Sequence, residues 1–141
     1  MLNFYPPYLG TGIRVNEISP DWHFMRVSMN LRWFNRNAVG THFGGSLFSM
    51  ADPHLMLMLL RILGKDYHVW DLSSSIRFVK PGKGRVTVLF QIEPEMIEDI
   101  LENTKDGQKY LPEFTLEIKD QEGEVVAEIK KILYIRLKKK R

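Results

Sequence analysis

The sequence predicts an α+β fold in which a curved antiparallel sheet wraps around one long central helix. Several segments alternate apolar and polar residues with the period of two that a half-buried strand requires. Between the second and third of them, residues 55–60 are apolar on every side, and a helix without a polar face has to lie inside other structure. Wrapping the strands around this helix buries the helix and covers one face of the sheet.

The expected strands are separated by clear turn signals, such as Ser19-Pro20-Asp21 after the first one. Their ranges are 13–18, 25–31, 68–79, 85–92, 114–118 and 124–137. The central helix is expected from residue 44 to about residue 62, and a short helix is expected over 94–103, starting at Pro94. In the last strand Lys131 interrupts the apolar positions, which predicts a β-bulge there.

Composition narrows the functions that are possible. With 141 residues the chain predicts one domain, taken as residues 1–136 followed by a basic tail, 137–141. The absence of cysteine excludes disulfides, thiolate zinc sites and a cysteine nucleophile. A formal net charge of +3 is too small to indicate nucleic-acid binding. The tail is typical of a solvated terminus, with contact to an anionic partner as the alternative.

The N-terminal residues and the most apolar run of the chain indicate where in the cell the protein is expected. The first residues lack a basic leader followed by an apolar stretch. The most apolar run, residues 55–63, is too short to cross a bilayer. We therefore expect a cytoplasmic protein without a membrane span.

The most informative segment is residues 37–53, which contains Asn37, Gly44-Gly45 and Asp52. It resembles the active-site segment of hotdog-fold thioesterases, most closely the phenylacetyl-CoA thioesterase-like branch. That branch has an Asn, a His-Gly-Gly turn, and an Asp seven residues after the second Gly. Over its whole length the chain is most similar to a hotdog subfamily known only as a domain of unknown function. The resemblance implies hydrolysis of a small acyl thioester, with coenzyme A as part of the substrate and no separate cofactor.

The residues themselves support this chemistry. Glycines at a helix N-terminus leave backbone N–H groups free beside the positive end of the helix dipole, where they can hold a developing oxyanion. Asp52 lies among Leu, Phe and Met, and desolvation there would raise its pKa and make it a stronger general base, or a nucleophile. Asn37 is expected to orient the attacking water or the thioester oxygen. The structural alternatives are tight packing for Gly44 and Gly45, a satisfied structural carboxylate for Asp52, and a local turn for Asn37.

The spacing of Gly45 and Asp52 predicts an oligomer. They are seven residues apart on one helix face, which places them ~10 Å apart along the axis. One thioester carbonyl cannot contact both, so a site that uses both has to take Gly45 from one subunit and Asp52 from another. Antiparallel helices related by a two-fold axis form such a site twice. We expect a homodimer, or a homotetramer built as a dimer of dimers.

Further residues are candidates for substrate binding. Phe43 stands where the related branch has His, and His42 comes one position earlier; a loop histidine bonded to the backbone is its structural alternative. Ser46 and Ser49 are expected to line the site, and Phe78 to form part of an acyl pocket, with ordinary core packing as its alternative. Cationic side chains around the Pro81-Gly82 turn are expected to hold coenzyme A phosphates, or simply to solvate a strand end. These are Arg77, Lys80, Lys83 and Arg85.

Other functions remain open at this level. The altered His and the helical Pro53 favour a non-catalytic protein that binds acyl-CoA or fatty acyl groups. A hydratase or dehydratase requires a histidine beside the acid, for which His42 and His54 are the candidates. The four histidines are scattered without metal-ligand spacing, so no metal site is expected.

Overall fold

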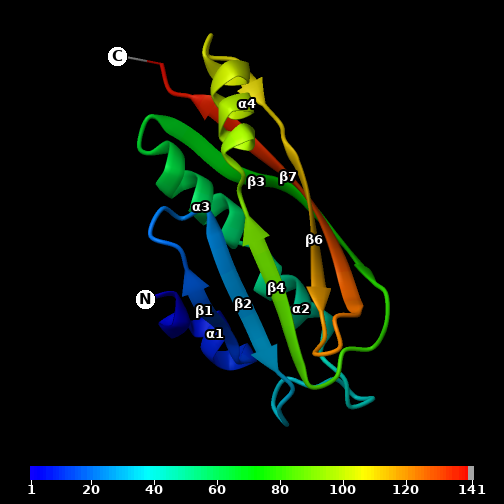
Figure 1. The fold of residues 1–141 in the computed structure, drawn as a ribbon. Helices are drawn as coiled ribbons and strands as arrows, with labels where there is room; N and C mark the ends of the chain where they lie inside the picture. Colours follow the sequence, from blue (N-terminus) through cyan, green and yellow to red (C-terminus); the bar gives the residue numbers. More distant parts are fainter. Residues whose placement is uncertain (140–141) are drawn as a thin grey trace.

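The structure is a computed structural model that describes residues 1–139. It contains a seven-stranded antiparallel sheet (Figure 1). Six of the strands follow the order β1-β2-β4-β6-β7-β3, and the seventh, β5, pairs with β7. The strands are β1 (Ile13–Ile18), β2 (Phe24–Asn30), β3 (Tyr67–Phe78), β4 (Arg85–Gln91), β5 (Lys109–Tyr110), β6 (Glu113–Lys119) and β7 (Val125–Leu137).

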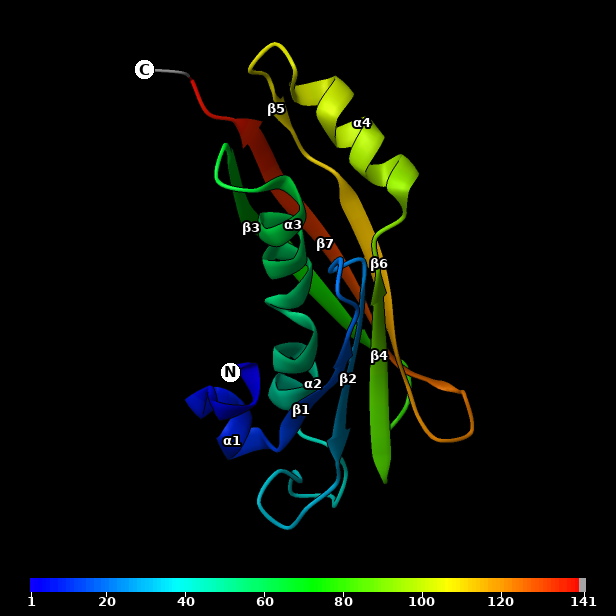
Figure 2. The same ribbon diagram turned by 60° about the vertical axis from the view of Figure 1, so that its left-hand side comes forward.

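Two consecutive helices, α2 (Gly44–Ala51) and α3 (His54–Leu63), lie in the hollow of this sheet, as Figure 2 shows. Their inward side chains and those of the strands form one core and are almost fully buried; among them are Leu47, Met50, Leu55, Met58, Leu59, Val27, Val88, Phe90, Ile129 and Leu133. Burial of each such side chain contributes about 1.5–3 kcal/mol. The predicted α+β architecture, a curved sheet around a long helix, is therefore confirmed.

The central helix differs from the prediction in one respect, because Asp52 and Pro53 divide it into two helices. Proline has no N–H to donate to the carbonyl of Ser49, so the helical hydrogen-bond ladder is interrupted at this point. Counted together, Gly44–Leu63 has 20 residues and a mean hydropathy of 1.3, enough for a membrane span by length and composition. Its inward face packs against the strands in one common core, so it is the core helix of this fold.

Lys131 does not mark a bulge, which corrects the sequence-based expectation. Its side chain has no exposed surface and lies on the inward face of β7, in step with Ile129 and Leu133. The register across β7 continues through Lys131, and the irregularity lies on the neighbouring strand, between Asp71 and Ser73 of β3. The strand keeps its register because the Lys131 ammonium finds charged partners inside the molecule.

The structure also contains three short elements that the sequence patterns do not predict. The sequence patterns did not predict the 3-10 turn Leu2–Phe4, helix α1 (Pro6–Thr11) or β5, whereas α4 (Pro94–Thr104) matches its expected range. Strand β7 extends to Leu137, and the Lys138 N–H donates to the Asp66 carbonyl at 2.8 Å. The last two positions of the expected basic tail, 140 and 141, lie outside the described residues.

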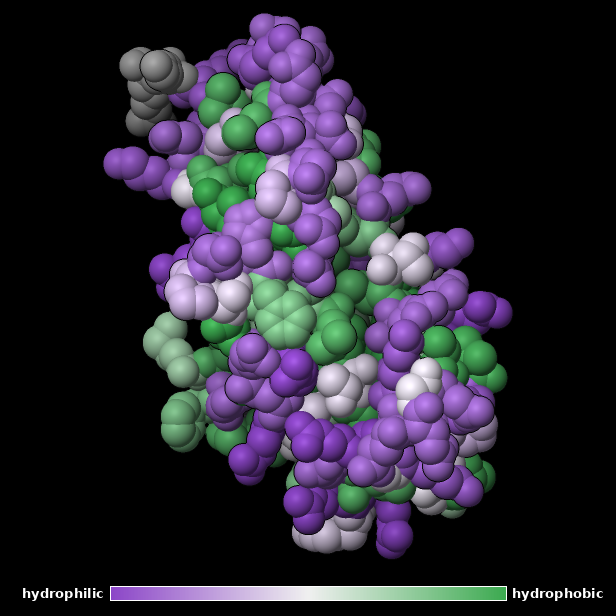
Figure 3. Space-filling model, viewed as in Figure 1, coloured by the Kyte–Doolittle hydropathy of each residue, from purple (hydrophilic) through white to green (hydrophobic). Residues whose placement is uncertain are grey.

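Strand β3 is the last strand in the sheet order, so its outer edge has no neighbouring strand among residues 1–139. It has 12 residues, and Trp70, Leu72 and Phe78 on it are 44%, 50% and 56% exposed. On the face seen in Figure 3, hydrophilic side chains predominate, and hydrophobic ones gather in a band across the middle. A long unpaired edge with exposed apolar side chains is a site where a second chain can add.

Candidate active site

The N-terminus of α2 presents free backbone donors at the surface. Gly44 and Gly45 occupy the first two helical positions, where geometry leaves their N–H groups without an intrahelical acceptor. The preceding residue, Phe43, gives no side-chain cap, and Gly45 is exposed. The Gly45 N–H therefore has no acceptor within α2, and its role as an oxyanion donor stays a prediction.

The same glycines also make close packing possible. A Cβ at Gly44 would lie 2.7 Å from the ring of Phe78, and one at Gly45 would lie 2.6 Å from the ring of Phe43. Both distances are shorter than any ordinary carbon contact, so the two aromatic rings pack directly against the turn. These contacts support the packing alternative at both glycines, and the donor role remains a prediction beside it.

Beside the turn lies an open cleft of about 450 Å³. Four of the predicted site residues line it: Phe43, Gly45, Ser46 and Ser49. The Ser49 hydroxyl donates to the Gly45 carbonyl at 2.8 Å, which fixes the first turn of α2. The rest of the lining comes from α1 and the loop after β2, namely Gly10, Thr11, Phe34, Asn35 and Arg36. The cleft combines apolar rings, hydroxyls and one guanidinium.

Asp52 lies at the other end of α2 and does not line this cleft. Its side chain is 56% exposed and faces the ammonium of Lys131, whose Nζ is 3.5 Å from Asp52 Oδ1. The desolvation expected from the neighbouring apolar sequence is therefore absent in the single chain. Gly45 and Asp52 lie at opposite ends of α2 and do not meet within one chain. A site shared between two subunits stays a prediction.

Lys131 and Asp71 are the charged residues that sequence reasoning missed. The Lys131 Nζ is 2.9 Å from Asp71 Oδ1 and also donates to the backbone carbonyl of Asp52. Burial raises the pKa of Asp71, while the nearby Lys131 charge acts in the opposite direction. The available signal was a lysine at an apolar position of the last strand, which requires a buried carboxylate.

A second buried polar pair lies just beyond the helix break. His54 is fully buried, and its Nε2 is hydrogen-bonded to the Tyr8 hydroxyl at 2.8 Å. Burial, and then the positive charge of Lys131, lower the pKa of His54 to about 3. Burial, and then the charge of Asp52, raise the pKa of Tyr8. This histidine is therefore neutral at physiological pH and enclosed by the core.

Asn37 and His42 belong to the loop that leads into α2, and their polar groups are engaged there. The Asn37 side-chain oxygen accepts the N–H groups of Val39 and Thr41, at 3.1 and 3.0 Å, and its amide donates to the Thr41 hydroxyl. His42 is buried and donates from Nε2 to the Gly84 carbonyl at 2.8 Å. Desolvation lowers the pKa of His42. Neither residue reaches the cleft in the single chain.

The predicted phosphate-binding cations lie near the β3–β4 connection, away from the cleft. Arg77 pairs with Glu128 at 3.4 Å, and the Arg85 guanidinium donates to the Ser28 hydroxyl at 3.1 Å. Lys83 is exposed on the connecting loop. Their binding of coenzyme A stays a prediction.

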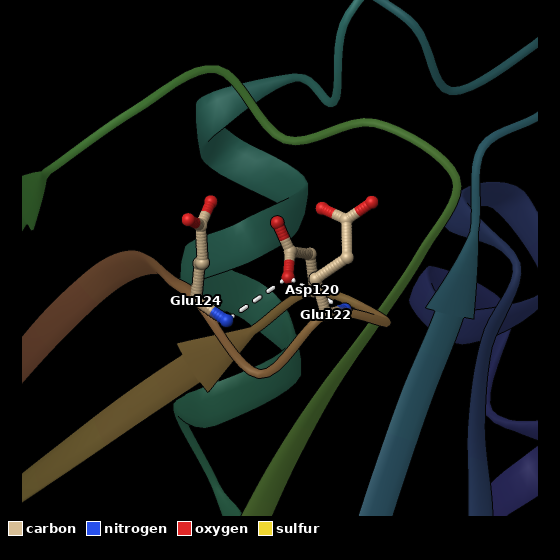
Figure 4. Close-up of side chains that lie close together, drawn as sticks. All are labelled: Asp120, Glu122 and Glu124. Atoms are coloured by element: carbon tan, nitrogen blue, oxygen red, sulfur yellow. Dashed lines mark hydrogen bonds between the residues drawn. The ribbon is translucent and has the colours of Figure 1, made fainter.

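Three carboxylates of the β6–β7 hairpin lie close together (Figure 4), and Lys80 pairs with two of them. The three are Asp120, Glu122 and Glu124, whose oxygens lie within 4.8 Å of one another. The Lys80 ammonium pairs with Asp120 at 2.7 Å and also with Glu124, and this pairing lowers the pKa of Asp120. Asp120 also accepts the N–H groups of Glu122 and Glu124. The cluster caps the hairpin, and Lys80 offsets part of its negative charge through Asp120 and Glu124.

Comparison with known proteins places this geometry in a family. The chain matches the model of a family described as "Domain of unknown function (DUF4442)" over residues 1–135. A search of curated proteins finds no match. A Pseudomonas aeruginosa protein of unknown function, described as a "Probable Thioesterase", is 25% identical with a TM-score of 0.78, over 90% of this chain and 84% of that one.

Two further solved structures share the fold. A thioesterase from Haemophilus influenzae is 15% identical with a TM-score of 0.70, over 96% of this chain and 86% of that one. The Escherichia coli PaaI protein of the phenylacetic acid degradation operon is 19% identical with a TM-score of 0.66, over 95% and 86% of the two chains. At these identities the likeness concerns the fold. The family match and the shared architecture together show that the chain belongs to the DUF4442 family, a hotdog-fold, thioesterase-like family of unknown function.

Proposed function

We propose that this protein is an acyl-CoA thioesterase-like hydrolase that works as a homodimer, with each site shared between two subunits. The observation that carries the proposal is the placement of two exposed functional groups at opposite ends of one helix, the Gly45 N–H and the Asp52 carboxylate. The hotdog fold shared with proteins described as thioesterases supports the same chemistry.

In the proposed reaction the thioester carbonyl oxygen accepts a hydrogen bond from the Gly45 N–H of one subunit. The Asp52 carboxylate of the other subunit takes a proton from water while the water oxygen attacks the carbonyl carbon. The Gly45 donor and the helix dipole stabilise the negative oxygen of the tetrahedral intermediate. The carbon–sulfur bond then breaks, and the leaving thiolate takes the proton from Asp52, which releases a carboxylic acid and a thiol.

Other predicted site residues take supporting roles in this proposal. Phe43, Ser46 and Ser49 form the wall of the cleft beside Gly45, and Phe78 supports Gly44 from β3. Asn37 shapes the loop that leads into α2, since its amide is fully used by that loop. Lys83 and Arg77, with their exposed charges, are candidates for the phosphates of coenzyme A.

The proposed dimer joins two protomers along β3. That strand ends the sheet and carries exposed apolar side chains, and antiparallel pairing of two copies is self-complementary under a two-fold axis. Such pairing would bring the central helices of the two subunits antiparallel to each other. A dimer of dimers, and a cytoplasmic location, remain part of the proposal.

A hydrolysis screen tests the function directly. We expect the purified protein to release free thiol from at least one member of a panel of short, long and aromatic acyl-CoAs. The Asp52→Ala variant should lose activity on that same substrate by about 10²–10⁴-fold, the usual contribution of a positioned general base. Since the Asp52 side chain is more than half exposed, the variant should keep its dimer mass and circular dichroism spectrum. Equal activity of the two proteins would remove Asp52 from the mechanism.

The second candidate is a non-catalytic protein that binds acyl-CoA or fatty acyl groups. It is favoured by Phe43 in place of a histidine and by the Lys131 charge beside Asp52. Isothermal titration with the same acyl-CoA panel separates the two, because a pure binder retains the intact thioester after overnight incubation. A hydratase has less support, because that reaction requires a histidine beside the acid. Both candidate histidines, His42 and His54, are buried, and neither lines the cleft.

A further inference from the structure

Asp52 occupies a position that is unfavourable for a carboxylate. It is the C-terminal cap of α2, where the helix dipole is negative and repels an anion. The following Pro53 breaks the helix, so this short stretch has fewer backbone hydrogen bonds than a continuous helix. Something outside the helix has to hold the Asp52 carboxyl group and its backbone in a defined orientation.

The group that does so is the ammonium of Lys131, which comes from β7 on the opposite side of the core. It has no exposed surface, and three oxygens surround it: the Asp52 carbonyl, Asp52 Oδ1 at 3.5 Å and Asp71 Oδ1 at 2.9 Å. An unpaired ammonium without contact to water is strongly unfavourable, so these oxygens together compensate the burial of Lys131. The bond to the Asp52 carbonyl also satisfies an acceptor at the helix end.

The surroundings of this cluster hold few other charges. Asp71 on β3 is the second carboxylate, with its side chain 22% exposed. The Tyr8 hydroxyl from α1 and the neutral His54 from α3 face the cluster but carry no charge at neutral pH. Lys131 is therefore the cation that opposes two carboxylates here, and Asp71 is the nearer of the two, at 2.9 Å against 3.5 Å for Asp52.

The exposure of Asp52 indicates what its contact with Lys131 achieves. Because Asp52 is more than half exposed, water screens its contact with Lys131, and Asp71, at 2.9 Å and 22% exposed, is the closer and less screened partner of the buried ammonium. The contact does, however, restrict the rotamers of the Asp52 carboxyl group, and a displacement of about 1 Å in a catalytic group can reduce a rate 10²-fold. The contact is therefore better suited to orientation than to stability.

We propose that Lys131 is a positioning residue, which Asp71 anchors in the core and which fixes the Asp52 carboxyl group in the orientation that thioester hydrolysis requires. This inference rests on the function proposed above and adds a third charged residue, from a distant strand, to the site. Lys131 itself does not contact the substrate, because it is completely buried.

The test compares Lys131→Met with two other variants. Lys131→Met keeps a long apolar side chain in the core, and we expect kcat to fall about 10–100-fold with KM changed less than about twofold. Lys130→Met alters the neighbouring exposed residue and should leave both constants unchanged. Asp71→Asn keeps an oxygen acceptor for Lys131 but removes the charge that anchors it, so kcat should fall in the same direction as in Lys131→Met and by a smaller factor, about a few-fold.

Crystal structures of the same proteins give a readout that does not depend on activity. In the wild type we expect one Asp52 rotamer facing Lys131, and in Lys131→Met a carboxyl group turned towards solvent. An unmoved carboxyl group, or a lower melting temperature with unchanged kcat, would overturn the positioning role. A wild type that hydrolyses no thioester would overturn the proposed function only, and the crystallographic comparison would still decide on Lys131. If Lys131→Met does not fold, Lys131→Gln replaces it in both measurements.

Discussion

Two inactive variants, Asp52→Ala and Gly45→Val, are expected to regain thioester hydrolysis when their subunits are combined in one dimer. Each variant alone damages both sites of its homodimer. Loss of the base reduces the rate about 10²–10⁴-fold. Valine at position 45 keeps the backbone N–H, but its side chain blocks the approach of the thioester oxygen, so the expected loss is about the 10²–10³-fold of a missing oxyanion donor. A side chain at Gly45 would also displace the Phe43 ring, which lies 2.6 Å from an added Cβ.

In a mixed dimer the Asp52→Ala subunit supplies an intact Gly45, and the Gly45→Val subunit supplies an intact Asp52. One site is then complete and the other carries both defects. Random assortment of equal amounts should therefore restore roughly one quarter of wild-type activity, since about half of the dimers are mixed and each has one working site. The measurement is kcat after denaturation and joint refolding, or for mixed dimers isolated with two different affinity tags.

The controls for this experiment are the two variants refolded separately and a refolded wild type. Activity in the mixture alone can come only from a site that combines residues of two chains. A mixture as inactive as its components would mean that Gly45 and Asp52 do not act across the interface. An active monomer in sedimentation experiments would lead to the same conclusion.

The sequence predicted the larger elements of this fold because periodicity is a local property. Strands such as β4 show their apolar face in every second residue, and the all-apolar stretch of α3 could belong only to a core. Helix α1 and strand β5 are too short for any period to appear, with six and two residues. Their positions depend on what they pack against, which local patterns do not contain.

In the candidate site, too, residues of one contiguous segment could be predicted from the sequence, whereas contacts between residues far apart in the sequence could not. Gly45 and Asp52 could be found because they lie in one contiguous segment with recognisable spacing. Lys131 was misread as a bulge because its partners, Asp71 and Asp52, are far away in the sequence. The pair of His54 and Tyr8, 46 residues apart, escaped notice for the same reason. Polar residues at apolar positions are the local sign of such contacts.

Acidification is expected to destabilise the protein through His54, and a His54→Gln variant should lose that dependence. Burial lowers the pKa of His54 from its ordinary 6.5 to about 3. Between these values the unfolded chain binds a proton that the folded protein does not, so stability is full above pH 6.5 and falls as the pH decreases. The slope approaches about 1.4 kcal/mol per pH unit, which amounts to about 3 kcal/mol by pH 4.5.

Urea unfolding of both proteins between pH 7.5 and 4.5 measures this effect. Glutamine offers a neutral amide to the Tyr8 hydroxyl in place of the His54 ring nitrogen at 2.8 Å, so the comparison removes the titration and retains a polar partner. Asp71 has a raised pKa and therefore acts in the opposite direction, but it is present in both proteins and cancels in the difference. The free energy of unfolding should thus fall more steeply in the wild type than in His54→Gln. Parallel curves would mean that the buried imidazole becomes protonated without unfolding, and the enclosed environment assigned to it beside Lys131 would be wrong.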